Sequence, residues 1–192
     1  RKLIGRSHCS HQKNRAPPNA PTKKTGTQTF KHAKKIADLL RERKETISVA
    51  ESSVGGLLSA SLLAVPGASD YYMGGTVVYT MRARRKLLGL SKEILDTQEP
   101  LTETYVSLLA KAIREQLRSD WAIAELGATG PGGTPYGHPP GICVLAVSGP
   151  KNLSKYLETQ SANREGNMCL FLEEGLNLLL KAQMKRLSLG KT

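Results

Sequence analysis

The sequence predicts an α/β domain in which helices cover both faces of a mixed sheet. Two observations support this prediction. Segments with strand and helix patterns alternate along the chain. Short apolar runs such as WAIAELG and GICVLAVSG also have the composition of buried strands. The length of 192 residues suits one domain with an extension, and we place the extension at residues 1–28 and the domain at 29–192.

The domain is expected to begin with a helix over residues 30–44, for which Thr29 is the predicted N-cap. A short buried strand at 46–50 follows, because its residues are β-branched or small. After a serine-bearing turn, an apolar helix is expected to end at Pro66-Gly67.

Residues 71–80 are rich in β-branched and aromatic side chains and predict the next strand. Within that strand, Gly74-Gly75 indicates a bulge or a close approach of another group to the backbone. Short helices are expected at 82–90 and 91–97, and Ser91 is the predicted cap of the second.

The clearest helix pattern covers residues 101–120, with Thr102 as its predicted cap. One face of this helix carries a row of apolar side chains at helical spacing: Val106, Leu109, Ile113 and Leu117. Strands at 121–127 and 141–149 are expected on either side of a glycine-rich loop.

A half-exposed strand is predicted at 153–160, because apolar and polar residues alternate there. The last helix is expected over 164–185. Its predicted core residues are leucines: Leu170, Leu176, Leu179 and Leu180.

Positive charge is concentrated at the N-terminus. The net charge is +12, yet residues 1–37 hold ten Lys and Arg and no acidic residue, so the remainder, with 18 basic and 16 acidic residues, carries only +2. Such an arm attracts polyanions through counterion release, which favours binding to nucleic acid. A solvated extension and an organelle-targeting presequence are the alternatives. The residues expected to contact phosphates are Arg1, Lys2, Arg6, Lys13, Arg15, Lys23 and Lys24.

The three cysteines, Cys9, Cys143 and Cys169, are odd in number and scattered. This pattern favours a reducing compartment and argues against both a disulfide scaffold and a zinc site. Cys143 lies in an apolar run and is expected to be buried. No apolar run approaches the ~20 residues of a membrane-spanning helix, which predicts a soluble protein.

Two loops are candidates for chemistry, and a third, the stretch after VVYT, could meet them at the ends of the strands. The turn AESSVGG places Ser52 and Ser53 next to the first turn of a helix, whose backbone amides have no partners within the helix. Serines at such a turn serve as nucleophiles in some folds and as simple helix caps in others. In the second loop, GATGPGG, the amides of Gly130, Gly132 and Gly133 can form a nest for a phosphate or an oxyanion.

These loops resemble motifs of the CinA C-terminal domain family, the nicotinamide mononucleotide (NMN) amidohydrolases. The family markers are A-E-S-C-T-G-G, then V-P-G-S-S with G-G-x-V-x-Y-S-N-x-x-K, then T-G-I-A-G-P-G-G. Here they read AESSVGG, VPGASDYYMGGTVVYTMRAR and LGATGPGG, in the same order, and the resemblance covers residues 30–185. It implies a three-layer α/β/α domain, commonly oligomeric, that hydrolyses the carboxamide of NMN to nicotinate mononucleotide and ammonia without a cofactor.

The resemblance also implies roles for particular residues. Ser52 would be the nucleophile, and Tyr79 matches the tyrosine of the second motif. The amides of Gly55 and Gly56 would stabilise the oxyanion. The family lysine, five residues after that tyrosine, corresponds to Arg84.

This last correspondence is a departure from the family. An arginine keeps its proton at working pH, so Arg84 cannot be a general base, although it can hold a phosphate or a carboxylate. Lys86 lies two residues further on and would point elsewhere from a helix. Other polar family positions have become apolar: Met81 replaces the asparagine, Val54 a threonine and Leu126 another threonine. Arg164 is the one arginine retained from a late family motif.

Three functions remain open at this point. The first is a degenerate, catalytically inactive member that is reused as a basic-armed, RNA-binding component of a ribonucleoprotein. An organellar ribosome is the expected assembly, in the mitochondrial matrix, with RNA and neighbouring proteins as partners and no membrane. The second is an active NMN amidohydrolase in an organelle, with a homo-oligomer as its expected state, in which Ser52 is activated by another base. The third is a regulator that binds a nucleotide without hydrolysing it.

Overall fold

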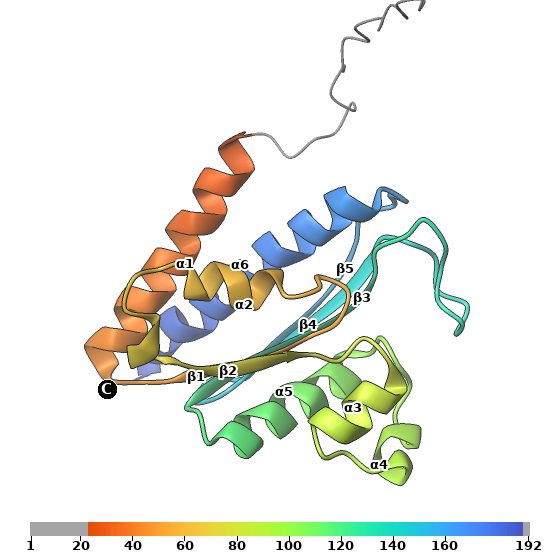
Figure 1. Ribbon diagram of the computed structural model, residues 1–192, viewed down its shortest axis with the longest axis horizontal. Coiled ribbons are helices and arrows are strands. Elements are labelled where there is room, and N and C mark those ends of the chain that lie inside the picture. The colour runs from red at the N-terminus through yellow and green to blue at the C-terminus, as the bar shows by residue number, and fades with distance from the viewer. Residues whose placement is uncertain (1–22, 190–192) are drawn as a thin grey trace, which may run out of the picture.

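The structure, a computed structural model, describes residues 23–189 and arranges them in three layers (Figure 1). The middle layer is a five-stranded sheet of order β2-β1-β3-β4-β5. β1 pairs in parallel with β2 and β3, whereas β3, β4 and β5 are antiparallel, so the sheet is mixed, as predicted. The strands span Ile47–Glu51 (β1), Tyr72–Val77 (β2), Trp121–Ala128 (β3), Ile142–Ser148 (β4) and Leu153–Glu158 (β5).

Helices cover both faces of this sheet, which confirms the predicted fold class (Figure 1). On one face lie α1 (Lys23–Arg43), α2 (Leu57–Leu63) and α6 (Arg164–Leu189). On the other face lie α3 (Met81–Leu87), α4 (Lys92–Asp96) and α5 (Glu103–Leu117). A short 3₁₀ turn, η1 (Ala68–Asp70), joins α2 to β2.

The sheet separates two apolar cores. On the first face, side chains of β1, β3 and β4 pack against α1, α2 and α6, with Leu58 and Phe171 fully buried. On the second face, α5 contributes Tyr105 and Leu109 to a core that also contains Ala124 of β3. Each strand of the sheet centre is therefore buried on both sides, which explains its continuous apolar sequence.

Local capping patterns were reliable for two helices. The Ser91 hydroxyl accepts a hydrogen bond from Ile94 N at 3.2 Å, and Thr102 accepts one from Tyr105 N at 3.2 Å, as predicted. Thr29 was wrongly predicted to be a cap, because α1 already begins at Lys23. Pro21 is the last proline before α1, so no residue after it forbids helical backbone angles.

Consequently, the predicted boundary between residues 28 and 29 falls inside α1. Lys23 and Lys24, which we assigned to the extension, belong to this helix. The other five predicted phosphate contacts lie outside the described residues: Arg1, Lys2, Arg6, Lys13 and Arg15.

On α6, Leu176 and Leu179 are fully buried and Leu180 packs partly against the core, as predicted. Leu170 was wrongly assigned to the core and is 42% exposed. Phe171, one residue later, takes the buried position, and the 100° step between helical neighbours turns Leu170 towards solvent.

The glycine pair in β2 has the predicted effect. The pairing of β1 with β2 shifts register between Ile47 and Ser48, which marks a bulge. A Cβ on Gly75 would approach the Ser59 hydroxyl to 2.6 Å and the Tyr72 hydroxyl more closely still. The glycine therefore permits α2 to pack closely on β2.

Cys143 is fully buried in β4, as predicted. Among residues 23–189, no helix combines the length and apolar character required to cross a membrane. The same part of the chain contains no group of three or more His, Cys, Asp or Glu side chains arranged to hold a metal ion.

Candidate functional site

The turn after β1 is held by the last residue of that strand. Glu51 is fully buried, and its carboxylate accepts hydrogen bonds from Gly56 N at 2.9 Å, Leu58 N at 3.0 Å and Ser59 N at 3.1 Å. The Ser59 hydroxyl donates a fourth. Gly56, the N-cap residue of α2, has a left-handed backbone and no capping side chain. Glu51 therefore performs the capping that Gly56 cannot.

A second buried carboxylate approaches the same turn from β3. Glu125 accepts hydrogen bonds from Ser52 N at 2.9 Å and Val54 N at 3.1 Å on one oxygen, and from the Ser53 hydroxyl on the other. The Cys143 thiol lies 3.9 Å from that second oxygen. Burial raises the pKa of Glu125, although the hydrogen bonds from Ser53, Ser52 and Val54 oppose the shift.

Neither Glu51 nor Glu125 was predicted from the sequence to have a role in the site. A signal for Glu125 was present, since it is the only charged residue in the apolar run WAIAELG. A carboxylate in the middle of a buried strand requires hydrogen-bond donors, and its presence predicts a polar partner nearby. Which partner it meets depends on tertiary contacts.

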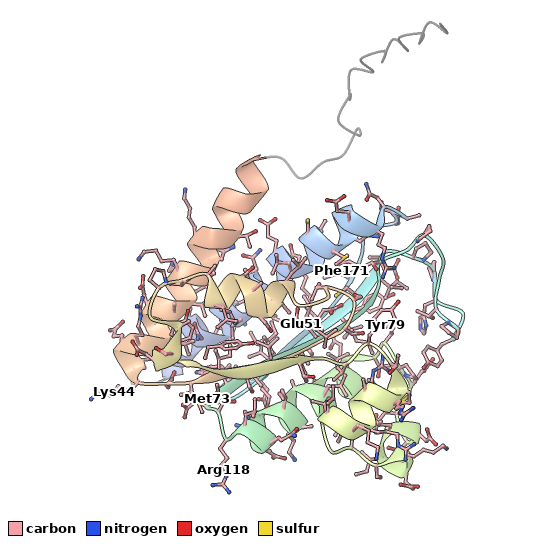
Figure 2. All side chains as sticks on the ribbon, viewed as in Figure 1. Lys44, Glu51, Met73, Tyr79, Arg118 and Phe171 are labelled. Carbon is pink, nitrogen blue, oxygen red and sulfur yellow. The ribbon has the colours of Figure 1, made fainter. Side chains whose placement is uncertain are left out.

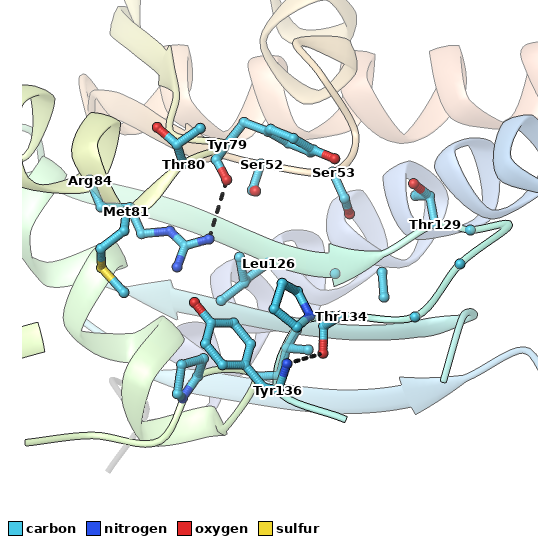
Figure 3. A pocket seen from close by; sticks show the side chains of 18 of the residues that line it. Ser52, Ser53, Tyr79, Thr80, Met81, Arg84, Leu126, Thr129, Thr134 and Tyr136 are labelled. Carbon is cyan, nitrogen blue, oxygen red and sulfur yellow. Dashed lines mark hydrogen bonds between the residues drawn. The ribbon is translucent and has the colours of Figure 1, made fainter. Parts of the chain in front are cut away.

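The candidate site is a cavity of about 310 Å³ at the carboxyl ends of the parallel strands β1, β2 and β3 (Figure 3). It brings together residues from all three predicted loops. Its functional lining consists of Ser52, Ser53, Tyr79, Arg84, Thr129, Gly130, Gly132, Gly133 and Arg164. Gly55 and Gly56 are not among its lining residues.

Arg84 projects from α3 and is 5% exposed. Its Nε donates to Val78 O at 3.3 Å, and its Nη atoms donate to the Tyr105 hydroxyl at 3.2 Å and to Tyr79 O at 3.5 Å. The guanidinium also lies 5.7 Å from the centre of the Tyr105 ring. No carboxylate of the described chain forms an ion pair with it, so this buried cation faces the cavity uncompensated (Figure 3). Lys86 is exposed and does not line the cavity, as expected.

Ser52 is 3% exposed, and its hydroxyl has no hydrogen-bond partner within residues 23–189. No basic side chain that can lose its proton lines the cavity beside it, since both cationic lining residues are arginines. The neighbouring Ser53 differs, because its hydroxyl already donates to Glu125.

The glycine-rich loop between β3 and β4 is tied to the start of α6. Arg164 Nη1 donates to Gly130 O at 2.7 Å, and Asn167 Nδ2 donates to Thr129 O at 2.9 Å. Gly130 has a φ of 100°, and a Cβ there would approach Ala162 O to 2.7 Å. The loop can therefore follow this path only with glycine at this position.

Three loops that meet at the ends of parallel strands define the class of protein. It is an α/β/α domain with a pocket at the carboxyl edge of its sheet. Residues 29–183 match the family described as the CinA C-terminal domain, and the chain belongs to this family. The resemblance predicted from the three motifs is thereby confirmed.

Similar proteins include a CinA-like protein of Prochlorococcus marinus (strain MIT 9313). It is 41% identical over 115 residues, which cover 60% of this chain and 27% of that protein. A CinA-like protein of Synechocystis sp. (strain ATCC 27184 / PCC 6803 / Kazusa) is 37% identical over 131 residues, 68% of this chain and 32% of its own length. The matched region thus spans about a third of the length of these curated relatives.

Solved structures agree with this assignment. A CinA superfamily protein of Klebsiella pneumoniae has a TM-score of 0.76 at 24% identity, covering 82% of this chain and 98% of that one. A competence or damage-inducible protein of Enterobacter asburiae has a TM-score of 0.75 at 27% identity, covering 81% of this chain and 98% of that one. Both support the three-layer fold.

Proposed function

We propose that this CinA-type domain is a degenerate member of its family that does not hydrolyse NMN through Ser52. The observation that carries the proposal is the environment of Arg84, the residue at the position of the family lysine. Arg84 is buried, and its guanidinium donates hydrogen bonds to Val78 O and to the Tyr105 hydroxyl. A guanidinium keeps its proton. Neither arginine of the cavity can therefore accept the proton of the Ser52 hydroxyl.

Oxyanion stabilisation from the serine turn is also restricted. The amide of Gly55 donates to Ser52 O at 3.2 Å, and that of Gly56 donates to Glu51 at 2.9 Å. The amides of Ser52 and Val54 donate to Glu125. A tetrahedral intermediate requires donors aimed at its oxygen. These four amides already have acceptors, so acyl transfer in this cavity would need a donor other than these, such as the Arg84 guanidinium.

The apolar replacements point in the same direction. Leu126 and Met81 line the cavity where the family motifs carry a threonine and an asparagine. Val54 is fully buried where the motif has the other threonine. Loss of hydrogen-bonding groups at a site reduces transition-state stabilisation by orders of magnitude when the substrate depends on them.

For the chain as a whole, the charge distribution favours reuse as an RNA-binding structural component of a ribonucleoprotein, such as an organellar ribosome. The ten basic residues within 1–37 supply the charge, whereas residues 38–192 carry only +2. Contacts between lysine or arginine and phosphate are largely independent of nucleotide sequence, which suits an anchoring role.

The catalytic part of the proposal is tested by incubating the full chain with NMN and measuring ammonia. We expect no turnover above the Ser52→Ala variant. Arg84→Lys is the matched gain-of-function variant, because it places a titratable amine at the family position. Hydrolysis by the wild-type chain that disappears in Ser52→Ala would overturn the proposal and establish the amidohydrolase alternative.

The RNA-binding part is tested by titrating a labelled single-stranded RNA with the full chain at several salt concentrations. Replacing Arg6, Lys13 and Arg15 by Gln removes three charges from the extension. The slope of log affinity against log salt should then shrink by about 2, since each neutralised phosphate contributes ~0.7. Gln at three exposed lysines of the domain, Lys44, Lys111 and Lys181, is the charge-matched control. Equal effects of both sets would contradict a role for the extension.

A specific observation supports a second function, binding of a phosphate-bearing ligand without hydrolysis. Two guanidinium groups, those of Arg84 and Arg164, line the same cavity as the glycine-rich loop. Arginine is well suited to phosphate recognition. Calorimetric titration with NMN should then show binding that Arg84→Gln weakens, in the absence of ammonia release.

A further inference from the structure

The geometry points to Ser53, with Glu125 as its proton acceptor, as a nucleophile able to take an acyl group from an ester. This inference goes beyond the proposed function and does not rest on it, because it concerns a hydroxyl other than Ser52. The two serines are adjacent in sequence and both line the cavity (Figure 3).

The first step is the pairing of the Ser53 hydroxyl with the Glu125 carboxylate. The Ser53 hydroxyl donates to Glu125, whereas the Ser52 hydroxyl has no partner in the described chain. A serine becomes nucleophilic when a neighbouring base removes its proton. Among the hydroxyl groups that line the cavity within residues 23–189, only that of Ser53 donates to a carboxylate.

The second step is the fixed position of the base. Glu125 is fully buried, and the amides of Ser52 and Val54 hold one of its oxygens, so the other oxygen remains directed at Ser53. The titratable groups that face it are Glu51 and Cys143. Burial and the charge of Glu51 both raise the pKa of Glu125, which makes it a stronger base than an exposed carboxylate.

The third step is access. Figure 2 shows Tyr79, which lines the cavity, at the same end of the sheet as Glu51 and Phe171. Behind this end, Gly127 lines the cavity beside Ser53, and a Cβ on Gly127 would come within 2.6 Å of the Ser53 oxygen. The same Cβ would also meet Ile142 O at 2.9 Å and the buried Phe171 ring at 3.0 Å, so only glycine fits beside the serine. Access itself rests on the cavity, whose lining includes Ser53.

The chemistry balances without a co-reactant other than water. The Ser53 oxygen bonds to the ester carbonyl carbon while its proton moves to Glu125. The carbon–oxygen bond to the leaving group then breaks, and the alkoxide takes the proton back from Glu125. Water hydrolyses the acyl-serine by the same steps. An ester suits this site better than an amide, because an alkoxide leaves more readily than an amide nitrogen that no acid has protonated.

The test uses the full chain with p-nitrophenyl acetate, following nitrophenolate release and locating the acetyl group by peptide mass spectrometry. We expect acetylation on Ser53, its loss in Ser53→Ala, and a fall of about 10²-fold in rate in Glu125→Gln. The wild-type rate should rise with pH as Glu125 ionises, and Glu125→Gln should abolish that rise. Ser107→Ala and Glu115→Gln, at exposed positions of α5, are the matched controls.

Acetylation confined to Ser52 or to lysines, absence of acetylation, or an unchanged rate in a folded Glu125→Gln chain would each overturn the inference. If Glu125→Gln does not fold, Ser53→Cys provides the second variant, since a thiol at the same position should be acetylated in place of the hydroxyl. None of these outcomes involves NMN. Failure here is therefore distinct from failure of the proposed function, which is decided by Ser52-dependent ammonia release.

Discussion

Replacing Glu51 is the most direct test of how the serine turn is held. Its two oxygens accept hydrogen bonds from the amides of Gly56, Leu58 and Ser59 and from the Ser59 hydroxyl. Glutamine has the same shape but only one oxygen, so Glu51→Gln leaves two of these donors facing an amide nitrogen. We expect α2 to be destabilised at its first turn.

The size of the effect follows from the number of donors that lose an acceptor. Each unsatisfied buried donor costs about 1–3 kcal/mol, so two of them lower the free energy of unfolding by about 2–6 kcal/mol. For a domain of this length, a loss of about 4 kcal/mol lowers Tm by about 8–16 °C. Typical domains are stable by only about 5–15 kcal/mol, so the change is large.

Urea unfolding followed by tryptophan fluorescence measures this effect, because Trp121 is the single tryptophan and is fully buried. Glu42→Gln, at an exposed position of α1, is the matched control and should change stability by less than about 0.5 kcal/mol. A loss below about 1 kcal/mol in Glu51→Gln would refute the assignment of Glu51 as the anchor of the turn.

Three further predictions concern other positions of the domain. Gln183 is fully buried, and its side-chain amide has no partner within the described chain, so Gln183→Leu should stabilise the protein by about 1–3 kcal/mol in the same urea assay. Gly75→Ala should destabilise it by about 1–3 kcal/mol, since the new Cβ meets the hydroxyls of Tyr72 and Ser59; a neutral result would show that β2 can move. Glu125 has a raised pKa in the folded state, so the fold binds its proton more tightly than the unfolded chain does. Its contribution to stability should therefore decline as pH rises above the ordinary glutamate pKa of about 4.3, and a wild-type curve parallel to that of Glu125→Gln would contradict this.

Local patterns in the sequence were sufficient for much of the fold. Apolar runs identified β1, β3 and β4, and the caps Ser91 and Thr102 were visible because a capping side chain contacts a backbone amide only three residues away. The start of α1 was missed, since polar residues after Pro21 carry no apolar periodicity. The helix as a whole packs against α6, and local sequence does not report such a tertiary contact.

Part of the candidate site could also be predicted from the sequence, whereas the rest could not. The motifs placed Ser52, Tyr79 and Arg84 around one cavity, because short motifs fix the residues at strand ends. The contact between Glu125 and the serine turn joins residues separated by more than 70 positions, and no local pattern encodes it. The partners of the Gly55 and Gly56 amides were missed for a similar reason, since they follow from the three-dimensional path of the turn.

The anchoring of α2 by Glu51 affects how such sequences are compared. A carboxylate that secures a helix is retained by selection for folding alone, whether or not the adjoining serine ever reacts. Survival of the A-E-S triplet in a diverging lineage therefore reports an intact scaffold. Retained turnover is better judged from the chemical type of the residue facing the hydroxyl.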